Sequence, residues 1–362
     1  MNPKSPLLLI GVGGAGSSIA YGVSRAFGAQ MRYVLCDTDA AGAREASPFI
    51  LLGGDRLSGH GSGGDAPQAK LAAEESLHLF GEHLDGVRLA VIVTALGGGT
   101  GSGSTIEILK HLRECGIPTI VFAAMPFEFE GEERIRRADA AIPVIEEFSG
   151  AAIFTPLDKL VGGEESMDAA MRRALDTIAS GVTLFWRLIL KPGYIRIDTE
   201  NIRRIIATAA RGHFATASAQ GDGRIDALVS SLKKSIAARQ GSKIKSILLG
   251  VLAGEDLRLS EVGALADAVR DAYGRDAAFN LATVNDEETF SGRIAAALML
   301  FETRGGEEAV STSSTRRRKR DANPLQQGPR GRGRFSNTAP TYINHEDVDV
   351  PTYIRKGLQL EI

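Results

Sequence analysis

The sequence is poor in cysteine. Two cysteines, Cys36 and Cys115, occur in 362 residues, which is too few for a disulfide framework or a cysteine metal cluster. Both lie in apolar or helical patterns. We therefore expect two buried thiols of a cytoplasmic protein.

Long hydrophobic runs are also missing. None approaches the roughly 20 residues that a membrane-spanning helix needs. The first apolar run, Leu7–Ile10, is short and leads directly into glycines, so we expect a first strand rather than a secretion signal. The hydrophobic content of 43% and charged content of 24% are those of a globular protein.

The net charge of −2 is unevenly distributed. Residues 304–340 hold nine basic and three acidic side chains, a net charge of +6, which leaves −8 for the remainder. This segment has few apolar residues, so it cannot bury enough surface to offset the entropy of ordering. We predict a disordered basic linker over residues 304–343 and a docking peptide over residues 344–362.

The basic tract Arg316–Arg320 within this linker has three interpretations. A solvated spacer is favoured, and contact with an anionic membrane surface is the second interpretation. No aromatic residues alternate with the charges, so binding to a specific nucleic acid is the least supported of the three.

The most informative stretch follows the apolar run Leu89–Val93. It reads G-G-G-T-G-S-G over Gly97–Gly103 and leads into a segment with helical spacing of apolar residues. Glycine backbone N–H groups and a helix N-terminus together predict a phosphate-binding loop. The loop is not a P-loop, because the Gly-Lys-Ser/Thr sequence is missing. The candidate phosphate ligands are Gly98, Gly99, Thr100, Gly101 and Ser102.

Two further glycine loops occur earlier in the chain. Gly11–Gly16 reads G-x-G-x-x-G after the first strand, and Asp37 follows a second strand at Tyr33–Cys36. This arrangement fits the dinucleotide fingerprint, so an NAD(P)-dependent dehydrogenase is a serious alternative. The loop Gly61–Gly64 is the third, and three such loops exceed what a dinucleotide fold normally uses.

Strand and helix patterns alternate through the first half of the chain, which predicts an α/β fold with a doubly wound parallel sheet. We predict a nucleotide-binding domain over residues 1–190 that ends in a long central helix at about 166–190. Residues 191–303 form a smaller α/β C-terminal domain. Its predicted elements are a helix at about 200–210, strands at 246–252, 278–283 and 292–300, and a helix at 259–273.

These motifs, in this order, resemble the FtsZ/tubulin family. The stretch P-F-E-F-E-G-E-E-R at Pro126–Arg134 is similar to a family motif, Asp37-Thr38-Asp39 resembles the family's N-T-D loop, and Asp349–Lys356 resembles its tail peptide. The resemblance implies a GTPase domain that binds GTP or GDP with Mg²⁺ on the phosphates and with no metal ligand from the protein. The implied nucleotide-binding residues are Gly13, Gly14, Ser17, Ser18, Asp37, Gly63, Gly64, Gly98, Gly99, Thr100, Gly101, Ser102, Glu130, Arg134 and Asp176, the last as the acid that reads guanine.

The same resemblance implies head-to-tail self-assembly into filaments for cell division at the division site. The stretch Arg196–Asn201 would be the synergy loop, which completes hydrolysis in the next subunit, with Asp198, Glu200 and Asn201 as its catalytic residues. Membrane tethers and regulators would bind Asp349–Lys356.

This chain departs from the family pattern at residues expected to take part in hydrolysis and nucleotide binding. The usual N-x-D-x-x-D reads Arg196-Ile-Asp198-Thr-Glu200-Asn201, so an amide replaces the second acid and Arg196 replaces an amide. Ser17 and Ser18 stand where the family has an Asn pair, and Leu157 replaces another Asn. We expect slow GTP hydrolysis, with a nucleotide-gated scaffold that does not hydrolyse GTP as an alternative.

Overall fold

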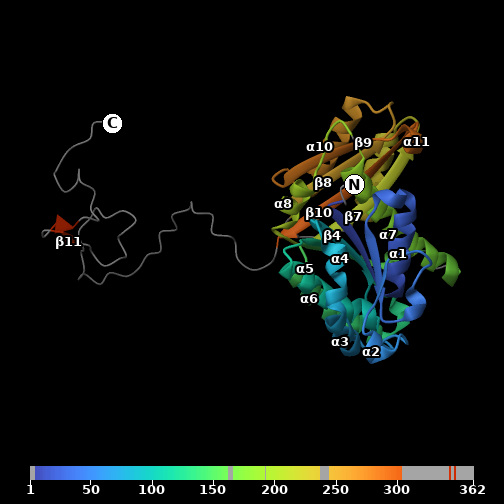
Figure 1. Cartoon of the computed structure of the whole chain (residues 1–362). Helices are drawn as coiled ribbons and strands as arrows, with labels where there is room; N and C mark the ends of the chain where they lie inside the picture. Colours follow the sequence, from blue (N-terminus) through green and yellow to red (C-terminus); the bar gives the residue numbers. More distant parts are fainter. Residues whose placement is uncertain are drawn as a thin grey trace, which may run out of the picture. The chain divides into compact units, whose positions relative to one another are not determined.

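The computed structural model describes residues 5–161, 166–191, 193–236 and 244–303, together with the backbone of two short strands near the C-terminus. Residues 1–307 form one compact unit and residues 308–362 a second. A mixed ten-stranded sheet runs through the first unit in the order β3-β2-β1-β4-β5-β6-β7-β10-β8-β9 (Figure 1). Its strands are β1 Leu7–Val12, β2 Tyr33–Asp37, β3 Phe49–Leu51, β4 Leu89–Ala95, β5 Thr119–Met125, β6 Ala151–Pro156, β7 Ala209–Gln220, β8 Ile244–Ala253, β9 Ala278–Asn285 and β10 Arg293–Thr303.

Eleven α-helices are present in the described part of the first unit. They are α1 Gly13–Phe27, α2 Gly54–Leu57, α3 Ala66–Ser76, α4 Gly81–Leu84, α5 Thr105–Glu114, α6 Glu132–Phe148, α7 Met167–Leu190, α8 Thr199–Ile206, α9 Arg224–Ser235, α10 Leu259–Tyr273 and α11 Glu287–Phe290. The predicted α/β fold is confirmed. The strands from β3 to β6 pair in parallel, and a smaller α/β part follows the long helix α7.

The smaller part differs from the prediction in three elements that the sequence analysis missed, β7, α9 and the short helix α11. Strand β7 reads A-A-R-G-H-F-A-T-A-S-A-Q and has no β-branched aliphatic residue, so its strand signal is weak. It pairs with β6 through two residue pairs, Ala152 with Arg211 and Ile153 with Gly212, and so joins both parts into one sheet.

One helix boundary also differs from the prediction. Helix α8 ends at Ile206 rather than near residue 210, because β7 begins at Ala209. Within the motif Pro126–Arg134, helix α6 begins at Glu132, after a 3-10 turn at Glu128–Glu130. Gly131 has a φ of 97°, which separates the turn from the helix.

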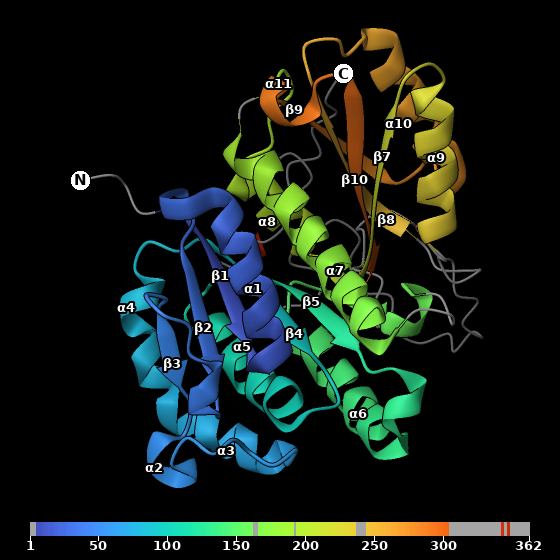
Figure 2. The same ribbon diagram turned by 90° about the vertical axis from the view of Figure 1, so that its right-hand side faces the viewer.

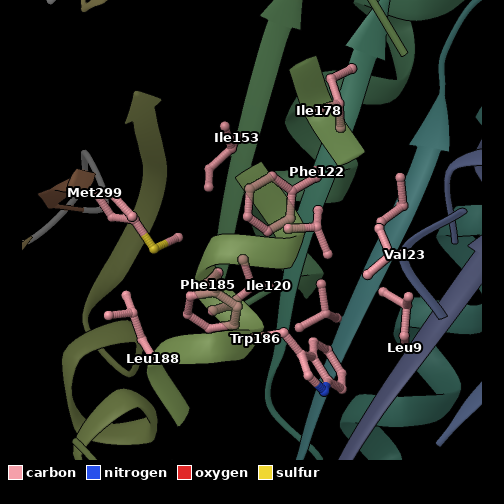
Figure 3. Packing of buried hydrophobic residues seen from close by; sticks show 14 of the residues in the cluster. Leu9, Val23, Ile120, Phe122, Ile153, Ile178, Phe185, Trp186, Leu188 and Met299 are labelled. Carbon is pink, nitrogen blue, oxygen red and sulfur yellow. The ribbon is translucent and has the colours of Figure 1, made fainter. Parts of the chain in front are cut away.

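Alternation along the strands divides the buried side chains between the two faces of the sheet. In β10, Ala295, Ala297 and Met299 face the α1 and α7 side, while the residues between them face α9 and α10. One hydrophobic core therefore covers the α1 and α7 face of both parts (Figure 3). The opposite face holds two separate cores, one under α3, α5 and α6 and one under α9 and α10.

Helix α7 is the element that both parts share. It carries 24 residues, and Ser166 caps its N-terminus by accepting a hydrogen bond from the backbone N–H of Ala169 at 3.3 Å. It runs beside α1 and between the two parts (Figure 2). Phe185 and Trp186 are fully buried, so the helix is fixed to the sheet along its second half.

The second unit is described only at its backbone pairing, where β11 Tyr342–Ile343 lies antiparallel to β12 Glu346–Asp347. The predicted tract Arg316–Arg320 and the predicted docking peptide Asp349–Lys356 lie outside the described residues. Across the residues that the structure does describe, every helix is too short or too polar to cross a bilayer.

The prediction of two buried thiols is half right. Cys36 is buried in β2, and burial together with the neighbouring Asp37 raises the pKa of its thiol. Cys115 is exposed, because it follows the last residue of α5 and leaves the apolar face of that helix.

Two helical glycines test how tightly α7 packs. A Cβ on Gly181 would lie 2.3 Å from Cε1 of Phe214, whereas a Cβ on Gly22 in α1 meets no atom within 4 Å. Both Gly→Ala changes gain about 1 kcal/mol of helix propensity. Overpacking costs Gly181→Ala about 1–3 kcal/mol in addition. In urea titrations, we expect Gly22→Ala to raise the free energy of unfolding. The free energy of unfolding of Gly181→Ala should be about 1–3 kcal/mol lower than that of Gly22→Ala, because of the overpacking. Equal effects would show that α7 does not press on Phe214.

Candidate functional site

A cavity of about 560 Å³ lies at the carboxyl ends of β1, β2, β4 and β5. Eleven of the predicted nucleotide-binding residues line it. They are Gly13, Gly14, Asp37, Gly63, Gly64, Gly98, Gly99, Thr100, Gly101, Glu130 and Arg134. The fold therefore brings all three glycine loops to one edge of the sheet, which is where ligands bind in α/β folds.

The central loop forms a π-helical turn at Thr100–Ser104 between β4 and α5. A Cβ on Gly101 would lie 1.9 Å from the carbonyl oxygen of Ala95, so only glycine permits this approach to the end of β4. A Cβ on Gly98 meets no atom within 4 Å. Gly98 therefore faces open space, and its backbone can approach a ligand.

Ser102 lies in the same turn but supports the loop rather than lining the cavity. It is 3% exposed, and its Oγ accepts a hydrogen bond from the backbone N–H of Gly97 at 2.9 Å. The sequence placed this hydroxyl among the phosphate ligands because it alternates with the loop glycines. In the structure its hydrogen-bond partner lies within the loop itself.

Thr38 connects two of the three glycine loops, and the sequence analysis did not assign it to the site. Its Oγ1 lies 2.7 Å from Oγ1 of Thr100 and accepts a hydrogen bond from the backbone N–H of Ser62 at 3.1 Å. Its side chain is fully buried. The one sequence feature that could have indicated a role for Thr38 in the site is its position between Asp37 and Asp39 at the end of β2.

The charged side chains that line the cavity are mainly acidic. They are Asp37, Asp39, Glu130 and Arg134, and the Arg134 guanidinium pairs with Glu130. An anion in this cavity would therefore be held by backbone N–H groups and helix N-termini. In the part of the chain that the structure describes, no three His, Cys, Asp or Glu side chains are grouped to hold a metal ion.

Asp37 is the most buried of these acids, at 5% exposure. Burial raises the pKa of its carboxyl group, although hydrogen bonds from the N–H groups of Asp39 and Thr38 and the hydroxyl of Thr100 oppose this effect. The backbone N–H of Thr38 donates at 2.8 Å. No cation contributes to this pKa, so the ionised carboxylate is poorly compensated.

One wall of the cavity is apolar and comes from Leu157, Met171 and Leu175. The two residues of α7 have the spacing of core residues, and the sequence analysis did not assign them to the site. Leu157 is 5% exposed and offers contact area without a hydrogen bond. This wall suits a flat apolar group such as a nucleobase.

Three predicted nucleotide-binding residues besides Ser102 do not line the cavity. The Oγ atoms of Ser17 and Ser18 donate to the carbonyl oxygens of Gly11 at 3.3 Å and Gly14 at 2.8 Å. Asp176 is exposed on α7, directly after Leu175, and lines a separate shallow hollow with Arg172 and Arg173.

The three predicted catalytic residues lie at the opposite end of the sheet. Asp198 caps α8, and its Oδ1 accepts the backbone N–H of Asn201 at 2.7 Å. With the Asn201 amide oriented to donate, its nitrogen lies 2.5 and 3.1 Å from the two carboxylate oxygens of Asp198. Asn201 therefore holds the Asp198 carboxylate.

Glu200 is bound by arginines on both sides. Its Oε2 lies 3.2 Å from Nη2 of Arg88 and 2.9 Å from Nη1 of Arg203. Arg88 precedes β4, whereas Ala95 at the end of β4 lines the cavity. Glu200 is thus separated from the cavity by the length of a seven-residue strand, about 20 Å.

Comparison with known proteins agrees with this geometry. Residues 6–163 match the model of the GTPase domain of the Tubulin/FtsZ family. The cell division protein FtsZ of Caulobacter vibrioides is 31% identical over 284 residues, which are 76% of this chain and 55% of that protein. The chain thus spans about half the length of that relative.

Solved structures share the fold. An empty FtsZ dimer from M. jannaschii superposes with a TM-score of 0.76 at 22% identity and covers 82% of this chain and 87% of its own. CetZ2 from Haloferax volcanii, solved as a GTPγS-bound protofilament, has a TM-score of 0.70 at 24% identity and covers 83% and 94%.

The buried acid gives a pH-dependent prediction. Because the folded-state pKa of Asp37 is raised above 3.8, its contribution to stability is full below that value and is lost as the pH rises through the folded-state pKa. Asp37→Asn removes the charge and retains an oxygen to accept the Thr38 N–H. We expect it to raise the Tm of the nucleotide-free protein near pH 7, with a gain that shrinks towards about pH 4. The exposed Asp39→Asn should change the Tm little, and a pH-independent gain for Asp37→Asn would contradict this account.

Proposed function

The chain belongs to the tubulin/FtsZ family, and we propose that it is a GTP-binding cytoskeletal protein that assembles head to tail for cell division. The cavity would hold GTP or GDP, with the glycine loops on the phosphates and the apolar wall against the base. Asp176, beside Leu175, would read the guanine edge. The cavity walls support this assignment because they combine an anion cradle with an apolar surface.

The observation that carries the proposal is the separation of the cavity from the Asp198 loop. Leu175 lines the cavity and Leu190 ends α7, and fifteen residues of helix correspond to about 22 Å. The loop after α7 is also fixed at the far end. The backbone N–H of Thr283 donates to the carbonyl oxygen of Ile195 at 2.8 Å, and the backbone N–H of Ile195 donates to Oγ1 of Thr283 at 2.9 Å. One chain therefore cannot bring Asp198 to its own cavity, and the proposal assigns that role to a second copy.

Hydrolysis would then occur between two subunits. A water oxygen attacks the γ-phosphorus, the bond from this phosphorus to the β–γ bridging oxygen breaks, and the water proton passes to the phosphate product. Asp198 of the adjacent copy orients the water, and Asn201 holds that carboxylate. Mg²⁺ carried by the phosphates supplies positive charge when bound. Positioning and charge stabilisation account for most of such catalysis.

The contact that links cavity and loop is heterologous, so it extends into a filament rather than closing. Further partners and location are part of the proposal. Tethers and regulators would bind Asp349–Lys356, Arg316–Arg320 would approach anionic membrane, and the protein would act in the cytoplasm at the division site.

The dehydrogenase alternative has one observation in its favour. The order β3-β2-β1-β4-β5-β6 is also that of dinucleotide-binding folds. The match of residues 6–163 to a GTPase domain favours GTP over NAD.

A substitution at Gly98 tests nucleotide binding. Gly98→Val places a side chain in open cavity space, so we expect the fold to persist and the phosphates to be excluded. Saturating GTP or GDP should raise the Tm of the wild type by ligand linkage, while NAD should not, and Gly98→Val should lose the response with an unchanged ligand-free Tm. Stabilisation by NAD instead of GTP would favour the dehydrogenase.

A substitution at residue 201 tests the expectation of slow hydrolysis. Asn201→Asp restores the second acid of the family pattern, so we expect faster phosphate release at equal polymer mass, by about 10-fold or more. Asn201→Ala removes the amide that holds Asp198 and should be slower than the wild type. No gain from Asn201→Asp would show that the amide is not what limits turnover.

A further inference from the structure

Among the described residues that line the cavity, no cationic side chain is uncommitted. Arg134 is the one Arg or Lys among its lining residues, and its guanidinium pairs with Glu130. Asp37 and Asp39 add negative charge on the side of the glycine loops. A triphosphate that loses its terminal group develops negative charge on oxygens of both products. Apart from Mg²⁺ carried by the nucleotide, no cationic side chain among the described lining residues is free to neutralise that charge.

Arg196 is a cation without a partner. In the part of the chain that the structure describes, its exposed guanidinium makes no ion pair or hydrogen bond. Arg88 and Arg203 at the same end of the molecule are both engaged by Glu200. Arg113 donates to the carbonyl oxygen of Glu147 at 3.1 Å.

The backbone holds Arg196 beside Asp198. Ile197 between them is 6% exposed, and the residue before Arg196 makes both hydrogen bonds to Thr283. A Cβ on Gly193 would lie 1.6 Å from the carbonyl oxygen of Thr283, so the loop also packs directly on β9. The exposed side chains of Arg196 and Asp198 therefore project from a backbone that is held in place, and both would contact the same surface of a partner.

We propose that Arg196 acts in trans as an arginine finger: it enters the cavity of the next copy and donates to the oxygens of the terminal phosphate of the bound nucleotide. This inference rests on the proposed function. Asp198 orients the water, and Arg196 neutralises the charge that accumulates as the bond to the β–γ bridging oxygen breaks. The guanidinium presents several donors in one plane, which suits phosphate oxygens better than a single ammonium group does.

The first experiment separates chemistry from assembly. Phosphate release is measured at equal polymer mass, determined by sedimentation, for the wild type, Arg196→Ala, Arg196→Lys and Arg204→Ala. Arg204 is an exposed arginine on α8 that lines the hollow beside that helix, so it controls for loss of one positive charge at this end. We expect Arg196→Ala to lower turnover by on the order of 100-fold or more, Arg196→Lys to recover part of it, and Arg204→Ala to retain wild-type turnover.

The second experiment tests action between subunits. Arg196→Ala keeps an intact cavity, and Gly98→Val keeps an intact loop. Each variant alone should be inactive, whereas their mixture should regain activity, because about a quarter of head-to-tail contacts in a random equimolar copolymer join a working cavity to a working Arg196. Activity restored by mixing would show that the loop that carries Arg196 acts on the cavity of another chain, and the partial recovery with Arg196→Lys in the first experiment separates a role of the charge from a purely structural role.

Two sets of results overturn the proposal. Turnover of Arg196→Ala within a few-fold of the wild type, or an equal fall for Arg196→Ala and Arg204→Ala, assigns Arg196 no specific role. An Arg196→Ala variant that assembles poorly but turns over GTP at the wild-type rate per unit of polymer makes Arg196 an interface residue only. Absence of GTP hydrolysis by the wild type contradicts the proposed function instead, so the two failures are distinguishable.

Discussion

The length of helix α7 is the constraint on which the site depends. Its first turns supply Met171 and Leu175 to the cavity, and its end leads into the Asp198 loop. Burial of Phe185 and Trp186 in the core shared by both parts of the sheet prevents the helix from tilting freely. Because the helix is rigid and fixed, the cavity and the loop remain apart in one chain. A site that needs both must be built by two copies.

Electrostatics explains why such a site gains from a second copy. The glycine loops provide backbone dipoles, but the charged lining is acidic and its arginine is paired. Burial raises the pKa of the Asp37 carboxyl group, and its negative charge makes the cavity less favourable for a further anion. Mg²⁺ on the nucleotide and Arg196 of the neighbouring copy would bring positive charge that offsets the acidic lining of the cavity. Assembly and catalysis would then depend on the same charges.

The sequence was sufficient where backbone conformation and hydrophobic periodicity determine structure. Gly98 and Gly101 predicted the cradle, because Gly101 allows close approach to the end of β4 and Gly98 leaves its backbone open to a ligand. Apolar runs predicted the strands beside it. Strand β7 escaped detection because small residues carry little strand signal. The sequence also did not predict correctly which side chains point into the cavity. Ser17, Ser18 and Ser102 bond to nearby backbone, and Met171 enters the cavity, which depends on tertiary contacts that periodicity does not encode.

The central claim is that each active site is shared between two copies of this chain. The most direct measurement is phosphate release per subunit from GTP across a series of protein concentrations that spans the onset of light scattering. A shared site predicts negligible release per subunit below that onset and a rise to a plateau above it. A rate per subunit that is constant at every concentration would contradict the account, because one chain alone would then hold a complete site.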